Sequence, residues 1–171
     1  MPDRDDAMRP GGPLRPSASH ATYVLAERFP VAPDAVFDVV AEVMHRRQAR
    51  ISPGRVSVVV EAADFRVGGT ERLRIDMPSA GAITGLRHYH EIVSAERIVA
   101  THVLTDGMRT VAVAMTTIEV EPLADEAGLR ITLQVATMEE SDRADACRLV
   151  FVALVDELRD RLGRPRRLGR R

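Results

Sequence analysis

The chain is 171 residues long, which suits one domain built around a single hydrophobic core. All 24 basic residues are arginine, so the chain lacks the lysine that a Schiff base or a P-loop needs, and its single cysteine, Cys147, cannot form an internal disulfide. The longest uncharged apolar run, residues 149–155, is too short to cross a bilayer and no signal-peptide pattern is present, so we expect a cytoplasmic protein without a membrane span.

The first part of the chain predicts a leader, a strand and a helix. Residues 1–20 are turn-forming and charged and offer almost nothing to bury, which predicts a disordered leader. Residues 22–29 alternate well enough for a strand, and Pro33 with Asp34 suits the first turn of a helix. Residues 45–50 form a polar segment that could be a second short helix. The apolar stripe of the first helix consists of Val36, Phe37, Val39, Val40 and Val43.

Six more strands are predicted after residue 55, because β-branched or alternating segments are separated by short turns. They cover residues 56–60, 70–77, 83–93, 97–105, 109–120 and 129–137. Asp106-Gly107 is a strong signal for a hairpin between two of them. Successive strands joined by short turns pair in antiparallel fashion, so the sequence predicts a seven-stranded antiparallel sheet.

One long helix is predicted near the end of the chain, with Ser141 as its N-cap and Leu162 in its last turn. Its apolar residues recur at intervals of three and four. They are Cys147, Phe151, Leu154, Leu158 and Leu162. No other long helix is available to cover the apolar face of the sheet. The sequence therefore predicts an α+β fold whose sheet wraps around this helix, with a cavity between them unless side chains fill it.

Charge is distributed unevenly along the chain. Residues 159–171 carry seven Arg and one Asp, a balance of +6, so the remaining 17 Arg and 24 acidic residues give −7. An acidic body disfavours nucleic-acid binding, because phosphate contacts need a basic face. We therefore expect one domain over residues 21–163, no nucleic-acid partner, and a basic disordered tail over residues 164–171.

Several motifs occur in an order that resembles a known family. They are the turn Asp64-Phe65-Arg66-Val67-Gly68-Gly69, the stretch Phe29–Phe37, the pair Glu91-Ile92, the stretch Glu96–Thr101, and a closing helix that contains Phe151, Val155 and Leu158. This order is similar to that of bacterial members of the Hsp90-ATPase-activator-like family. The family lies within the helix-grip superfamily of START, polyketide-cyclase and Bet v 1-like domains. The resemblance covers roughly residues 22–162 and implies the helix-grip fold.

The chain departs from this family where the closing helix faces the sheet. Val150-Phe151 stands where the family commonly has Gly-Trp, and no Trp occurs in the chain. The change alters the volume of the cavity and removes an indole N–H donor. The resemblance therefore implies the fold and leaves the ligand open.

Candidate pocket residues come from the predicted inward faces. Tyr89 and Glu91 are interpreted as sharing one strand face, where a buried Glu beside a Tyr could act as a general base, or where the pair could form a hydrogen bond at the rim. Met115 could line a cavity or pack in the core. The residues expected at the pocket are Phe37, Tyr89, Glu91, His102, Met115, Leu133 and Phe151.

Metal chemistry is not expected from this sequence. His88 and His90 are two apart on one strand and His102 falls on the next, but no further ligand completes a metal site. Cys147 is expected to be an inert apolar side chain on the closing helix. We therefore expect neither a metal nor a cofactor.

The function favoured by the sequence is non-catalytic binding of a small apolar molecule in the cavity. One alternative is a polyketide cyclase- or dehydratase-like enzyme that uses Tyr89 and Glu91, and another is a protein-interaction module like the Hsp90 activators. A cavity of about 300 Å³ or more would favour a ligand, an exposed apolar patch would favour a protein partner, and converging buried polar groups would favour catalysis. We expect a monomer or a homodimer.

Overall fold

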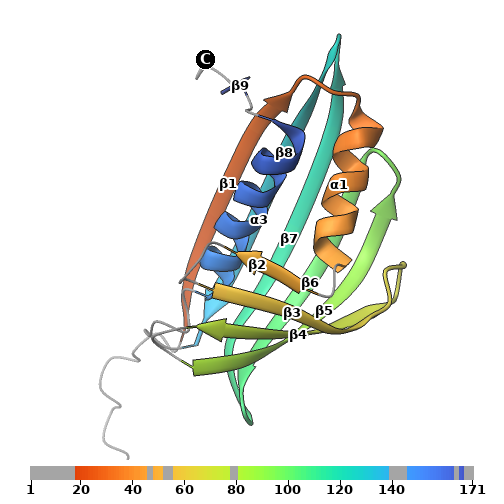
Figure 1. Ribbon diagram of the computed structural model, residues 1–171. Helices are drawn as coiled ribbons and strands as arrows, with labels where there is room; N and C mark the ends of the chain where they lie inside the picture. Colours follow the sequence, from red (N-terminus) through yellow and green to blue (C-terminus); the bar gives the residue numbers. More distant parts are fainter. Residues whose placement is uncertain are drawn as a thin grey trace, which may run out of the picture.

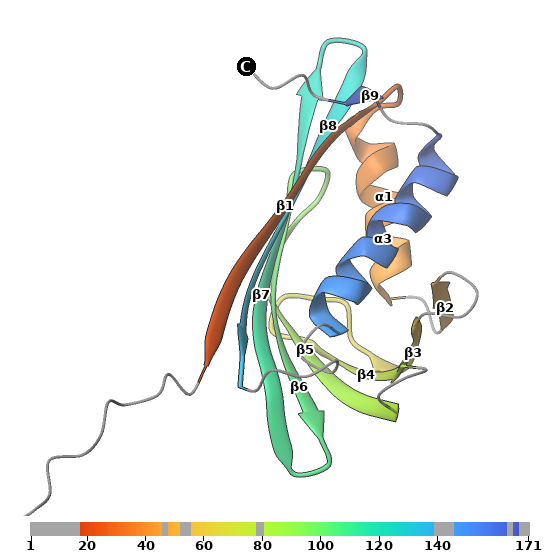
Figure 2. The ribbon, with the colours of Figure 1, turned by 90° about the vertical axis from the view of Figure 1, so that its left-hand side faces the viewer.

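The computed structural model describes residues 18–45, 48–51, 56–77, 81–138, 146–163 and 166–167. In these parts the chain forms one curved antiparallel sheet, and two helices lie on its concave face (Figure 1). Turned by 90°, the sheet is seen to curl beneath the lower end of the helices (Figure 2). None of the described helices combines the length and the apolar character needed to cross a membrane.

The elements follow one another largely as the sequence indicates. The first are strand β1 (Ser19–Phe29), helix α1 (Pro33–His45) and strands β2 (Gln48–Ile51), β3 (Val56–Ala63) and β4 (Thr70–Met77). They are followed by strands β5 (Gly81–Val93), β6 (Arg97–Asp106), β7 (Arg109–Leu123) and β8 (Glu126–Thr137), helix α3 (Ala146–Leu162) and strand β9 (Arg166–Arg167). The expected N-cap of α3, Ser141, lies outside the described residues.

The sheet confirms the predicted fold. Its strand order is β2-β3-β4-β5-β6-β7-β8-β1-β9, and every neighbouring pair is antiparallel. All seven predicted strands are present, and strands β3 to β8 pair with one another in chain order. The first strand, β1, instead pairs with β8 along the whole length of β1.

Two short strands were not predicted. Residues 48–51 form β2 against β3, in a region where the polar segment 45–50 is compatible with a short helix. Pairing there satisfies backbone groups of β3 that would otherwise lie at an open sheet edge. In the tail, which was expected to be disordered, Arg166–Arg167 pairs with Glu27 and Arg28 of β1.

The core between the sheet and the helices has two parts. The first surrounds α1 and the C-terminal half of α3, and the second lies over β3 and β4 near the N-terminal end of α3. Phe151 of α3 packs against both parts. The helix that was predicted to cover the sheet therefore bridges the whole core.

Two arginines attach the C-terminal end of α3 to its surroundings. Arg159 forms a bidentate contact with Glu27 of β1, in which Nε lies 3.0 Å from Oε1. Arg161 forms a second fork with Glu42 of α1, with N–O distances of 2.9 and 3.0 Å. Bidentate arginine–carboxylate pairs add both energy and geometric precision, so the contact with the buried Glu27 helps to hold α3 on the sheet. The exposed contact with Glu42 orients α3 relative to α1 and adds little energy.

Truncating Leu158 should destabilise the domain strongly. Its side chain is 1% exposed, so Leu158→Ala removes buried methyl groups and leaves a cavity, which should cost about 2–5 kcal/mol in the free energy of unfolding. Val152 lies on the same helix and is 41% exposed, and Val152→Ala should therefore cost less than about 0.5 kcal/mol. Equilibrium denaturation with urea measures both, and equal costs would mean that α3 does not close the core.

Candidate functional site

A cavity lies between the concave face of the sheet and α3. Its lining is contributed by α1, by β4 to β8 and by α3. The lining residues are Met44, Leu73, Ile75, Arg87, His102, Leu104, Ala114, Thr116, Leu133, Cys147, Val150, Phe151 and Leu154. The cavity measures about 60 Å³. This is room for a few water molecules and is well below the roughly 300 Å³ at which typical ligand pockets begin.

One side of the cavity is polar. Glu71 of β4 lies directly opposite Arg87 of β5, and Arg87 lies directly opposite His102 of β6. Thr116 of β7 continues the row, with its Oγ1 3.0 Å from Nε2 of His102. The strand register therefore aligns Glu71, Arg87 and His102, and Thr116, which lies diagonally across from His102, extends the row through its hydrogen bond. Arg87, His102 and Thr116 line the cavity.

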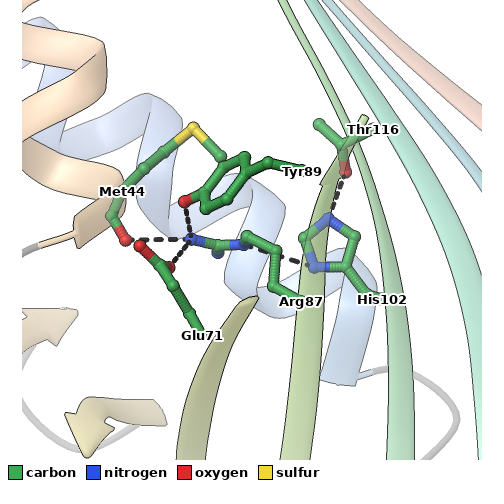
Figure 3. Close-up of polar contacts among 6 residues, drawn as sticks. All are labelled: Met44, Glu71, Arg87, Tyr89, His102 and Thr116. Atoms are coloured by element: carbon green, nitrogen blue, oxygen red, sulfur yellow. Dashed lines mark hydrogen bonds and ion pairs between the residues drawn. The ribbon is translucent and has the colours of Figure 1, made fainter. Parts of the chain in front are cut away.

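Arg87 is the centre of this row (Figure 3). Its Nη1 donates to Oε2 of Glu71 at 2.8 Å, to the carbonyl oxygen of Met44 at 2.9 Å and to the Tyr89 hydroxyl oxygen at 3.3 Å. Its Nε donates to Nδ1 of His102 at 3.5 Å, the longest of these contacts. Arg87 is 7% exposed and Glu71 is 1% exposed, so this is a buried ion pair with further hydrogen bonds.

The Asp64–Gly69 turn holds Tyr89 in place. Gly68 donates its N–H to the Tyr89 carbonyl, and the Tyr89 N–H bonds the carbonyl of Gly69. A Cβ atom at Gly69 would lie 2.1 Å from the carbonyl oxygen of Asp64, so only glycine fits there. Phe65 packs edge-on against the Tyr89 ring, with centroids 4.9 Å apart. The motif that carries the family resemblance thus positions a side chain that contacts Arg87.

Burial shifts the titration of two members of this network. The pKa of His102 falls to about 3, first because the imidazole is buried and second because the Arg87 cation is close. Burial also raises the pKa of Tyr89 above its ordinary value, with Arg87 opposing the rise and Glu71 adding to it. At neutral pH both side chains are therefore uncharged.

Five of the seven sequence-derived candidates lie in two neighbouring environments. His102, Leu133 and Phe151 line the cavity, on β6, β8 and α3 respectively. Phe37 and Tyr89 are buried in the adjoining part of the core, and Tyr89 reaches the site through its contact with Arg87. These five candidates are thus brought together around the sheet–helix interface.

Met115 differs from its expected position. It is 39% exposed on the outer face of β7, because the strand alternates and Ala114 and Thr116 take the inward positions. The segment around it is apolar on both faces, which hides the alternation. Ile118 and Glu119 further along the strand carry a clearer signal, since the apolar residue must face inward and the charged one outward.

Glu91 also differs from its expected position. A β-bulge falls between Tyr89 and Glu91, so the two side chains do not share one face. Glu91 instead pairs with Arg97, whose hydrogen bond lowers the pKa of the carboxyl group. A buried glutamate with a raised pKa, as an acid–base pair with Tyr89 would need, is not formed there.

Two charged site residues were missed from the sequence. Glu71 and Arg87 are charged, and charged residues are usually exposed. Their positions nevertheless carry a signal, because Glu71 alternates in phase with Leu73 and Ile75, which are inward-facing residues. A charged side chain in phase with an apolar strand face indicates a buried, partnered charge.

The described residues contain no group of His, Cys, Asp and Glu side chains that could hold a metal ion. His88 and His90 pack against each other on the outer face, with ring centroids 4.6 Å apart, whereas His102 faces the cavity. Cys147 is buried at the cavity wall, and burial raises the pKa of its thiol to about 12, so it remains an unreactive thiol at neutral pH.

Comparison with known proteins gives the family. The sequence pattern of the family described as activator of Hsp90 ATPase homolog 1-like protein matches residues 30–163. The chain belongs to this family. The match covers α1, all strands from β2 to β8 and α3, and so includes every residue of the site. No curated protein shows a significant match to the chain.

Solved structures confirm the helix-grip, Bet v 1-like fold of this family member. The Mll3558 protein from Rhizobium loti is 26% identical with a TM-score of 0.68, over 85% of this chain and 99% of its own. An uncharacterized protein from Rhizobium leguminosarum is 24% identical with a TM-score of 0.67, over 85% and 96%. Ara h 8.0201 is 11% identical with a TM-score of 0.63, over 84% and 98%.

Removing one partner of the buried ion pair should destabilise the domain more than replacing both partners with apolar residues. Arg87→Leu leaves Glu71 as an unpaired buried charge and should cost about 3–5 kcal/mol, as should Glu71→Leu. The double variant should be more stable than either single variant, because neither buried charge remains. Urea denaturation of all four proteins gives the coupling energy. The exposed pair Arg74–Asp76 on the same sheet is the control. The double-mutant cycle of this pair should give a coupling energy below about 1 kcal/mol.

His102 should make the stability of the domain depend on pH. The folded-state pKa is about 3 and the unfolded imidazole titrates near 6.5, so the unfolded chain takes up the proton first. The contribution of His102 to the free energy of unfolding is complete above about pH 6.5. It falls as the pH drops towards 3, by up to about 1.4 kcal/mol per pH unit. His102→Gln should remove this part of the slope between pH 6.5 and 4. Parallel curves for wild type and variant would contradict the assignment.

Proposed function

We propose that the protein binds a small, mostly apolar molecule between the sheet and α3. The observation that carries the proposal is the composition of the cavity wall, which is apolar except for Arg87, His102 and Thr116 among the described residues. A ligand pocket typically combines an apolar lining with a few placed polar groups that fix orientation. The family and fold agree with such a role.

The small volume of the cavity sets a condition on this proposal. About 60 Å³ is less than the roughly 150 Å³ that holds benzene in an engineered cavity, so a ligand of that size must displace side chains. Met44 and Phe151 are at the wall, and methionine in particular adapts its shape. Arg159 and Arg161 fix the opposite end of α3, so we propose that room is made at the Cys147–Phe151 end of the helix.

The titration of the network favours binding over acid–base catalysis. A general acid or base works best with a pKa near the operating pH. The pKa of His102 lies far below neutrality and that of Tyr89 lies above its ordinary value, so neither exchanges a proton readily at pH 7. The converging polar side chains are therefore better suited to orienting a ligand than to a cyclase-type reaction.

A protein-interaction role is the second candidate, supported by one separate observation. Leu86, Val103 and Val113 lie opposite one another on β5, β6 and β7, and all three are exposed on the outer face of the sheet. Exposed apolar patches often mark sites of protein association. The name of the family suggests a chaperone as one possible kind of partner.

Substitution of Phe151 tests the ligand-binding proposal. Phe151→Ala should enlarge the cavity and admit larger apolar probes, at a cost of about 3 kcal/mol in stability because a largely buried ring is lost. Phe151→Trp should fill the space and weaken probe binding, since overpacking costs about 1–3 kcal/mol. Binding is measured by titrating a fluorescent apolar probe. Val152→Ala, on the exposed face of the same helix, is the control and should bind as wild type does.

Native mass spectrometry of the protein purified from its own host tests the same proposal without a chosen probe. A co-purifying small molecule that is lost in Phe151→Trp would support ligand binding. Equal probe binding by wild type and all Phe151 variants, with no co-purifying molecule, would instead favour the interaction role. In that case Val103→Arg on the outer face should abolish partner capture while leaving stability unchanged, because Val103 is exposed.

A further inference from the structure

The polar wall of the cavity offers hydrogen-bond donors. Nε of Arg87 can only donate, so Nδ1 of His102 must accept, and the imidazole hydrogen resides on Nε2. Nε2 therefore donates to Oγ1 of Thr116. The hydroxyl hydrogen of Thr116 is not needed by His102 and is free to point elsewhere. This assignment fixes the direction of the hydrogen bonds along the row.

Arg87 has a second donor group to offer. Its Nη1 contacts three acceptors, on Glu71, Met44 and Tyr89, and its Nε contacts His102. Nη2 has no hydrogen-bond partner among the described residues, and it is not among their fully buried, unpaired atoms. Arg87 and Thr116 both line the cavity, and the Nη2 hydrogens and the Thr116 hydroxyl hydrogen are the donors of these two side chains that no partner among the described residues accepts.

The charge of this wall is already balanced. The carboxylate of Glu71 lies 2.8 Å from Arg87 and is buried with it, so the positive charge has its counter-ion within the protein. His102 adds no charge at neutral pH. A ligand carboxylate would lose its hydration without gaining an unpaired cation, and it would lie near Glu71. A neutral oxygen acceptor avoids this cost and still receives both hydrogen bonds.

We propose that the ligand is a neutral molecule with an apolar body and a carbonyl oxygen, which accepts hydrogen bonds from the Thr116 hydroxyl and from Nη2 of Arg87. The inference rests on the proposed function, because it names the class of molecule held in the same cavity. It predicts selection against the corresponding carboxylic acid, although an arginine lies at the wall. It also predicts that Thr116 distinguishes a carbonyl from a hydrocarbon of the same shape.

Three probes of nearly equal shape test the proposal: acetophenone, its hydrocarbon analogue α-methylstyrene, and benzoate. Dissociation constants are measured by calorimetry or by NMR titration at pH 7, with wild type and with the enlarged Phe151→Ala cavity. Acetophenone should bind, and benzoate should bind at least about tenfold more weakly because an anion must be desolvated. α-Methylstyrene should bind through its apolar body alone.

Substitutions at Thr116 identify the hydrogen bond. Thr116→Val keeps the shape but removes the hydroxyl, and should weaken acetophenone binding about two- to tenfold while leaving α-methylstyrene unchanged. Thr116→Ser keeps the hydroxyl and should retain the preference. Thr117→Val is the matched control, because Thr117 alternates to the opposite face of β7 and should alter neither probe.

The outcomes separate this inference from the proposed function. Benzoate binding as tightly as acetophenone, or equal effects of Thr116→Val on acetophenone and α-methylstyrene, would overturn the carbonyl assignment while leaving the apolar cavity as a binding site. Failure of all three probes to bind, in wild type and in Phe151→Ala, would overturn the proposed function and this inference with it.

Discussion

Two opposite charges, on Glu71 and Arg87, are buried side by side on neighbouring strands, and burying them is costly unless each is satisfied. The partners of Arg87 come from different parts of the chain: the end of α1 provides the carbonyl of Met44, β5 provides Tyr89 and β6 provides His102. Tyr89 is in turn held by the Asp64–Gly69 turn. The end of α1, the Asp64–Gly69 turn and the polar side of the cavity are therefore all linked to one ion pair.

The sequence predicts secondary structure best where apolar residues keep one spacing over a long segment. The alternation of β4 and the three- and four-residue spacing along α3 are sustained over eight and seventeen residues, and both elements were predicted. Phe151 could be assigned to the side of α3 that faces the sheet for the same reason. Met115 shows the limit of this argument, because its neighbours in β7 are apolar on both faces and only the charged residue Glu119 reveals which face is inward.

Contacts between strands were less accessible from sequence. The alignment of Glu71 with Arg87 depends on the register of β4 against β5, which local periodicity does not define. The bulge after Tyr89 turns Glu91 away from the site, and no residue type in that strand announces it. Arg87 could therefore be suspected of being buried from its phase in the strand, but its partners required the structure.

The two ends of α3 have different roles, and this affects which substitutions the protein can accept during evolution. Arg159 and Arg161 bind Glu27 and Glu42 at one end, whereas Phe151 meets the cavity towards the other. Substitutions at the cavity end can alter the shape of the binding site while the arginine contacts keep the helix attached. Such a separation makes ligand preference evolvable, since new specificities can be sampled without first losing the folded state.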